Sequence, residues 1–460
     1  MQSTHDLRAG FARSLSTMYG TEVPAYNTLV EVSTAVNADV LAADPDRAER
    51  LGRIDRVTAE RHGAIRVGTA AELRQVAQIF AALGMSAVGF YDLRGTESTS
   101  LPIVSTAFRP TTAGALAINP FRVFTSVLVT DDRRYFDAEL QAQLDAFLAR
   151  RQLFGPQLLD LAERAEADGG LDNDLAEGFL RLATASFELS PEPVDRAWYN
   201  RLAAISGVAA DIGGVPTTHI NHLTPRVLDI DDLYRRMEAL GIAMIDEIQG
   251  PPRWAGPDVL LRQTSFKALA EPRRFREPDG HVVAGTLSVR FGEVEQRGIA
   301  LTPPGRDLYD RLIVEIDQRS AGQTAAQRND LKVEVWQANW PTTETALLQR
   351  GQAFFEFNAG TGRGEPAADL HGLVAQGWLV PSPIVYEDFL PRSAAGIFAS
   401  NLDNQGRRDA SLEGSHRDQD WIAGAIGREV FDPMALYADQ SHASLTAACA
   451  ALGVEIPGQS

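Results

Sequence analysis

The sequence predicts an α+β fold built from two βαβββ modules, and a repeated segment is the main reason. Residues 62–93 read HGAIRVGTAAELRQVAQIFAALGMSAVGFYDL, and residues 222–248 read HLTPRVLDIDDLYRRMEALGIAMIDEI. Each copy starts with a strand-like run, continues with helical periodicity and ends with a second strand-like run. Two further strand-like runs follow each copy, so the order of elements also repeats.

In the first copy, residues 62–68 are short, apolar and alternating, which is typical of a strand. Thr69 and Glu72 form a Thr-x-x-Glu capping box, which predicts the start of a helix. Gly84 ends that helix, because its apolar residues stop there. The strand-like runs that follow lie at 87–93, 103–108 and 121–129.

In the second copy, residues 219–228 form the first strand, and Asp229 or Asp231 can cap the following helix. Gly241 ends that helix. The three predicted strands that follow are 242–248, 258–269 and 285–296.

The repeat divides the chain into five predicted segments. The last of them is predicted to contain a helix at 306–320, strands near 332–338 and 352–357, and a final helix at 434–451. The segments are an N-terminal helical segment (1–60), the first module (61–130), a helical insertion (131–214), the second module (215–305) and a mixed α/β region (306–460).

Composition narrows the functional classes. The 460 residues carry a net charge of −18, which argues against binding to nucleic acids or anionic membranes. Cys449 is the single cysteine, so no intrachain disulfide can form, and a cytoplasmic location is expected. We see no secretory signal and no apolar run long enough to span a bilayer. The expected partner is therefore a small molecule.

The repeat also indicates candidate functional residues. His62 and Arg66 in the first copy match His222 and Arg226 in the second. Equivalent histidines can meet near a pseudo-two-fold axis, and imidazole is a common metal ligand. His219 is an alternative to His222, but the register of the repeat favours His222. Arg226 has the same register as Arg66 and is open to a structural role.

Two βαβββ modules around a shared cavity resemble the vicinal oxygen chelate superfamily. This resemblance implies an open, barrel-like sheet in which first-strand histidines and a last-strand carboxylate bind one divalent metal. In the last strand, Leu287, Val289, Phe291, Glu293 and Glu295 share a face, so alternation does not choose between the two glutamates.

A resemblance to a known strand motif favours one of the two glutamates. FGEVEQRG is similar to the Phe-x-Glu-x-x-Gln-Arg strand of 4-hydroxyphenylpyruvate dioxygenases, with Phe291, Glu293, Gln296 and Arg297 as the matching residues. The match implies that Glu293 is the ligand. Two histidines and one carboxylate make the facial triad of non-heme Fe(II) oxygenases, which leaves coordination positions open.

Five blocks resemble the 2-oxoadipate dioxygenase/decarboxylase family more closely. The resemblance implies conversion of 2-oxoadipate and O2 to D-2-hydroxyglutarate and CO2 in lysine catabolism. It also implies Fe(II) ligands at His62, His222 and Glu293, a substrate-binding Arg66 and a substrate contact at Ser393. The blocks are 62–69, 221–231, 262–269, 291–303 and 386–398.

Arg66 suits a dicarboxylate. It lies four residues after His62 on the same strand face, and the two Cα atoms should be roughly 13 Å apart. A guanidinium can grip the distal carboxylate of a six-carbon diacid with two hydrogen bonds. Arg392 replaces a small apolar residue of the family, which leaves the exact 2-oxo acid open.

Two alternatives remain at this stage. One is a related metal-dependent dioxygenase that acts on another 2-oxo acid. The other is an inactive metal-binding or ligand-binding protein on the same scaffold, because a protein can keep its fold after it has lost its catalytic activity. The sequence leaves the physiological metal and the oligomeric state open.

Overall fold

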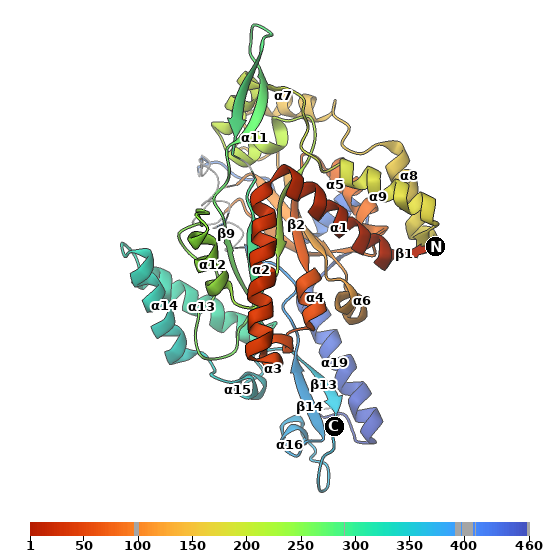
Figure 1. Cartoon of the computed structure of the whole chain (residues 1–460), viewed down its shortest axis with the longest axis vertical. Helices are drawn as coiled ribbons and strands as arrows, with labels where there is room; N and C mark the ends of the chain where they lie inside the picture. Colours follow the sequence, from red (N-terminus) through yellow and green to blue (C-terminus); the bar gives the residue numbers. More distant parts are fainter. Residues whose placement is uncertain (96–100, 289, 392–396, 398–407, 410, 458–460) are drawn as a thin grey trace.

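The computed structural model describes residues 1–95, 101–288, 290–391, 397, 408–409 and 411–457. Its largest sheet has six strands in the order β15-β3-β4-β5-β2-β8 (Figure 1). Among the described residues the structure is a mixed α/β fold with several sheets, none of them closed. The six strands are β15 (Val430–Phe431), β3 (Ser86–Asp92), β4 (Ile103–Arg109), β5 (Arg122–Leu128), β2 (Arg61–Val67) and β8 (Ile220–Pro225).

The first copy contains every predicted element. The predicted helix is α5 (Ala70–Ala81), and one further helix, α6 (Ala113–Ile118), lies between β4 and β5. Thr69 caps α5 by accepting a hydrogen bond from the backbone N–H of Glu72 at 3.1 Å. The predicted reciprocal bond to Thr69 is replaced, because the Glu72 carboxylate accepts from the backbone N–H of Gly68 at 2.6 Å.

The second copy departs from the prediction at two places. The helix is α12 (Ile230–Ala239), but the predicted strand 242–248 contains only one isolated bridge, Met244 to Phe266, and a second bridge, Gln249 to Gln263, follows it. The run 258–269 contains the shorter strand β9 (Leu261–Ser265). Backbone pairing in this stretch is too sparse for a continuous strand.

The predicted strand 285–296 is two strands. β11 (Val282–Leu287) forms a projecting hairpin with β10 (Glu271–Arg276), and β12 (Glu293–Arg297) pairs with β9 (Figure 1). Leu287 therefore does not share a strand with Glu293, and Val289 lies outside the described residues. The strand is interrupted before β12, where the buried Arg290 side chain donates a hydrogen bond to Glu271 at 2.9 Å.

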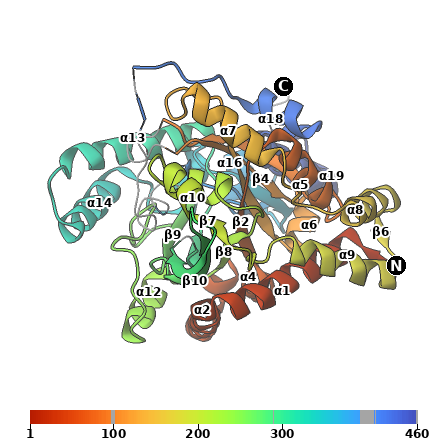
Figure 2. The same ribbon diagram turned by 90° about the horizontal axis from the view of Figure 1, so that it is seen from above.

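Helices cover the rest of the sheet region. Viewed from above, α1 and α9 lie side by side, as do α5 and α8 (Figure 2). Residues 131–214 contain mainly helices, and the division into five segments stays a prediction. The helices of residues 1–214 not yet named are α1 (Thr4–Glu22), α2 (Pro24–Ala43), α3 (Pro45–Glu49), α4 (Ile54–Ala59), α7 (Ala138–Leu148), α8 (Pro156–Asp168), α9 (Asn173–Ala185), α10 (Arg196–Ala203) and α11 (Gly207–Gly213); the short strands are β1 (Gln2–Ser3), β6 (Gly170–Leu171) and β7 (Val194–Asp195).

The C-terminal region surrounds a second core that contains Trp336. The strand predicted at 332–338 is wrong: this stretch belongs to a helix, which starts at a capping box formed by Thr324 and Gln327. The alternating apolar residues of KVEVW (332–336) are typical of a strand, but the helix that starts upstream continues through them. The elements are α13 (Pro303–Arg319), α14 (Ala325–Asn339), α15 (Glu344–Gln349), β13 (Phe355–Ala359), α16 (Leu370–Ala375), β14 (Leu379–Pro383), α18 (Gln419–Ile426) and α19 (Pro433–Leu452).

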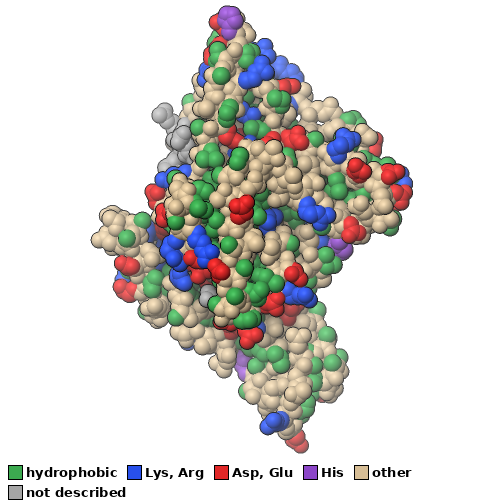
Figure 3. Space-filling model, viewed as in Figure 1, with side chains coloured by type: hydrophobic (Ala, Val, Ile, Leu, Met, Phe, Trp, Pro, Cys, Tyr) green, Lys and Arg blue, Asp and Glu red, His purple; other side chains and the backbone are tan. Residues whose placement is uncertain are grey.

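The surface carries mixed charge. On the face shown in Figure 3, acidic and basic side chains are interspersed among neutral and apolar ones. Within the part of the chain that the structure describes, every helix is too short or too polar to cross a bilayer.

Candidate metal centre

Strand pairing brings His62 and His222 together. β2 and β8 are antiparallel, with His62 opposite Thr224 and His222 opposite Ala64. The two histidines are therefore diagonal neighbours on one face of the sheet. Their ring centroids lie 5.4 Å apart, with the rings nearly perpendicular.

Glu293 completes the group from β12, which lies beside the end of β8 through a parallel bridge between Arg226 and Glu295. Its Oε2 is 3.2 Å from Nε2 of His62, and its Oε1 is 3.5 Å from Nδ1 of His222. One ligand atom from each of the three residues lies within 4.8 Å of the others, and all three are buried. No second group of this kind occurs among the residues described.

The chemistry of these side chains fits a divalent cation. Both ring nitrogens of His222 are buried without a hydrogen-bond partner. Burial lowers the pKa of His222 to about 4, so the ring is neutral and can offer a lone pair. Around Glu293, the nearest non-histidine donors are neutral: Gln263 at 3.4 Å and Thr224 at 3.5 Å. A cation would satisfy this carboxylate and the imidazoles together.

His62 is held differently. Burial lowers its pKa, but the negative charges of Glu295 and Glu293 and the hydrogen bond to Glu293 outweigh that effect, so the pKa is raised. Burial would also raise the pKa of Glu295, but Arg297 and His62 lower it to about 2. Glu295 is therefore ionised at neutral pH.

Glu295 points to the same side of β12 as Glu293 but lies outside the group of three. Arg297 grips it with two hydrogen bonds of 2.8 Å, and Arg122 donates to it at 3.3 Å. Because these guanidinium groups already balance its charge, Glu295 is a poorer ligand for a cation than Glu293. The structure thus separates two glutamates that strand alternation could not.

Two other residues considered from the repeat, Arg226 and His219, bond to partners outside the group of three. Arg226 donates to Glu60 at 2.9 Å and to the backbone oxygen of Leu51 at 2.8 Å, which is a structural contact. The nearest partners of His219 are Asn221, at 3.1 Å, and Asp211, at 3.4 Å, so it is not one of the three.

Arg66 is buried, and its Nη1 donates to Asp211 of α11. Asp211 in turn accepts from the side chain of Asn221 at 3.0 Å, at the point where the register between β2 and β8 shifts by one residue. Asp211 was not predicted as part of the site. Nothing in the local sequence distinguishes it from the other acidic residues of the helical segment.

The C-terminal region also reaches the centre, through residues that were not among the predicted site residues. The ring of Phe389 meets His62 edge to face at 5.0 Å between centroids. Next to it, Asp388 accepts hydrogen bonds from Arg109 at 2.7 and 3.1 Å and from the hydroxyl of Tyr437. Ser393 and its neighbour Arg392 lie outside the described residues.

His219 makes the stability of the metal-free protein depend on pH. Burial lowers its pKa from 6.5 to about 4, so between these values the unfolded chain binds a proton that the folded chain does not. This contribution to stability is complete above pH 6.5 and is lost as the pH falls towards 4, on the order of 3 kcal/mol.

We therefore expect His219→Asn to flatten the fall in melting temperature between pH 7 and pH 4.5. His222 has the same direction of shift and leaves part of the slope in place. Melting curves of both metal-free proteins at several pH values measure the effect, and parallel curves would contradict it.

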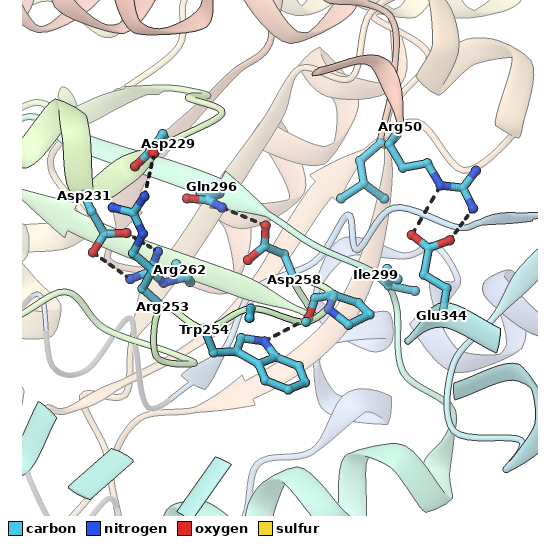
Figure 4. A pocket seen from close by; sticks show the side chains of 14 residues that line it. Arg50, Asp229, Asp231, Arg253, Trp254, Asp258, Arg262, Gln296, Ile299 and Glu344 are labelled. Carbon is cyan, nitrogen blue, oxygen red and sulfur yellow. Dashed lines mark hydrogen bonds and ion pairs between the residues drawn. The ribbon is translucent and has the colours of Figure 1, made fainter. Parts of the chain in front are cut away.

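A separate pocket of about 450 Å³ is lined in part by Gln296 of β12 (Figure 4). Because side chains alternate along a strand, Gln296 points to the face of β12 opposite to Glu293 and Glu295. Gln296 donates to Asp258 at 2.9 Å and accepts from the backbone N–H of Ile230 at 3.0 Å. Arg262 pairs with Asp231 at 2.7 Å in the same pocket. These polar groups bond to one another, and none of the three candidate ligands lines the pocket.

Comparisons with known proteins agree with this geometry. A model of the 2-oxoadipate dioxygenase/decarboxylase family matches residues 11–401. The chain belongs to this family. Among the 2-oxoadipate dioxygenase/decarboxylases, the protein of Mycobacterium bovis is 56% identical over 94% of this chain and 96% of its own length. That of Pseudomonas putida is 41% identical over 98% of both chains.

A solved structure from the same bacterium, described as hydroxyglutarate synthase in complex with 2-oxoadipate, is also similar. It has a TM-score of 0.83 and 38% sequence identity, and the match covers 98% of this chain and 99% of that one. The similarity to this hydroxyglutarate synthase structure is therefore global and includes the C-terminal region.

Proposed function

We propose that this protein is an Fe(II)-dependent dioxygenase/decarboxylase that converts 2-oxoadipate and O2 to D-2-hydroxyglutarate and CO2. The observation that carries the proposal is the meeting of His62, His222 and Glu293 within 4.8 Å, in a chain of a family named for this reaction. The substrate is a six-carbon diacid that loses one carbon as CO2 and gains a hydroxyl group, so both atoms of O2 enter the products.

The three residues would hold the metal and leave open positions on one side. Iron, when bound there, supplies redox chemistry and sites for a 2-oxo acid and O2. His222 offers a neutral imidazole, and Glu293 offers a carboxylate that accepts hydrogen bonds from the neutral side chains of Gln263 and Thr224. The surrounding side chains exclude water, since the ligands and Phe389 are all buried.

Arg66 would orient the substrate through a carboxylate. It extends from the same strand as His62, and Asp211 holds its Nη1, so its position is determined before substrate arrives. A guanidinium has five N–H donors and can bind a second carboxylate while it keeps Asp211. Ser393 as a further substrate contact stays a prediction.

The bridges support the proposed two-module architecture. In the first copy, β3 and β4 are antiparallel, β4 and β5 are antiparallel, and β5 is parallel to β2. In the second copy, the isolated bridges at Met244 and Gln249, the β9–β12 pairing and the parallel bridge at Arg226 follow the same order. We propose that the two halves form the open, barrel-like sheet of a vicinal oxygen chelate protein. A role in lysine catabolism and a cytoplasmic location also stay predictions.

The proposal is tested by loading the purified protein with Fe(II) under anaerobic conditions and measuring O2 uptake with 2-oxoadipate. We expect one O2 consumed per CO2 released and a product identified as D-2-hydroxyglutarate by chiral chromatography. Uptake only with other 2-oxo acids, aromatic ones included, would assign a different substrate. Binding of 2-oxoadipate without any O2 uptake would instead indicate an inactive ligand-binding protein.

A further inference from the structure

The ring of His62 lies between two carboxylates of the same strand. Its Nε2 is 3.2 Å from Oε2 of Glu293, and its Nδ1 is 2.9 Å from Oε2 of Glu295. Glu293 and Glu295 are two residues apart in β12, so both side chains leave the same face of the strand. The two nitrogens of one imidazole thus face two acids with different surroundings.

The two carboxylates differ in the hydrogen-bond donors around them. Glu295 is fully buried and is held by Arg297 and Arg122, while the non-histidine donors around Glu293 are neutral. Arg297 is itself fixed, because it also donates to the backbone oxygens of Tyr386 and Asp388 at 2.7 and 3.0 Å. Glu295 therefore has a rigid position and a compensated charge.

A rigid carboxylate on the far nitrogen has a known effect on metal-binding histidines. When one ring nitrogen binds a metal, the other usually donates its N–H to a carboxylate or carbonyl group, which sets the tautomer and the ring orientation. In this structure Nδ1 is within contact distance of Glu295, although its N–H does not point along the line between the two atoms. A hydrogen bond here would leave Nε2, the nitrogen beside Glu293, as the donor to the metal.

We propose that Glu295 is a positioning residue that accepts the Nδ1–H of His62 and so presents Nε2 to the metal. This inference rests on the proposed metal site and adds a fourth residue to it. It also assigns a function to the guanidinium groups of Arg122 and Arg297, which keep Glu295 in place.

The test compares Glu295→Gln with Glu60→Gln. Glu60 is a matched control because it is a fully buried carboxylate bound to the same Arg122, at 2.7 Å, and lies 3.4 Å from Arg297, but is not a partner of His62. Both variants remove one negative charge beside Arg122 and Arg297, and Glu60 additionally pairs with Arg226. Affinity for Co(II) is measured by competition with a chelating dye under anaerobic conditions, and the absorption spectrum of the Co(II) protein reports the ligand geometry.

We expect Glu295→Gln to lower Co(II) affinity roughly 10- to 100-fold and to change the Co(II) spectrum. Glu60→Gln should lower the melting temperature but leave the affinity and the spectrum close to those of the wild type. If Glu295→Gln does not fold, Arg297→Lys replaces it: lysine keeps the charge but loses the two-pronged grip on Glu295, and affinity should again fall.

Wild-type affinity and spectrum in Glu295→Gln, or in a folded Arg297→Lys protein if Glu295→Gln cannot be obtained, would overturn the inference and leave the proposed function intact. Equal losses in Glu295→Gln and Glu60→Gln would also overturn it, because they would assign the effect to the charge network as a whole. A wild-type protein that takes up no metal would overturn both the inference and the proposed function.

Discussion

Replacing His62, His222 or Glu293 by alanine is expected to abolish metal binding and turnover. Loss of a residue that merely supports a ligand costs roughly 10- to 100-fold in metal affinity, so loss of a direct ligand should cost more than about 100-fold. The three residues contribute ligand atoms that lie within 4.8 Å of one another, and no other described residues form such a group that could replace them.

Two measurements check this prediction independently of activity. Metal content after dialysis reports binding directly, and added Fe(II) should raise the melting temperature of the wild type but not of the variants. His219→Asn is the matched control, because His219 is a buried histidine near the site that belongs to a different set of contacts. Full metal content and activity in any alanine variant would remove that residue from the group of ligands.

The second large effect is expected at Arg66. Arg66→Lys should lower kcat/KM for 2-oxoadipate up to about 100-fold, since lysine keeps the charge but loses the paired hydrogen bonds that a carboxylate receives from a guanidinium. The same variant should change kcat/KM for 2-oxohexanoate little, because that acid has six carbons but no distal carboxylate. Steady-state O2 uptake with the two acids measures the difference.

The partner of Arg66 affects the choice of variants. Alanine at this position would leave Asp211 buried without its guanidinium, which costs about 3–5 kcal/mol for a broken buried pair. The double variant Arg66→Met with Asp211→Asn removes both charges and separates binding from folding. If both acids lose the same factor in Arg66→Lys, Arg66 acts on the site as a whole and does not grip the distal carboxylate.

The repeat was visible in the sequence because side-chain periodicity and capping are local properties. The strand 61–67 and the helix after Thr69 could be predicted from alternation and from the first turn of the helix. The same local reasoning failed at 285–296, where an alternating pattern runs across a break between β11 and β12. It also failed at 332–338, where a helix start seven residues upstream determines the outcome.

The equivalence of His62 and His222 could likewise be predicted, since duplicated segments occupy equivalent positions. Alternation placed Glu293 and Glu295 on one face and could not separate them, and the distinction came from a family resemblance. In the structure it comes from Arg122, which lies on β5, and from Arg297, which is fixed by the backbone near Asp388. Which arginine meets which glutamate depends on strand packing.

By itself, the sequence determined the repeat, the paired histidines and the family, because each of these is recorded in short stretches of neighbouring residues. Only the tertiary structure decided that Asp211 holds Arg66, that Phe389 covers His62 and that Glu295 faces its second nitrogen. The physical reason is distance along the chain: these partners are 145 to more than 300 residues apart. They meet only when the sheet and the C-terminal region pack together.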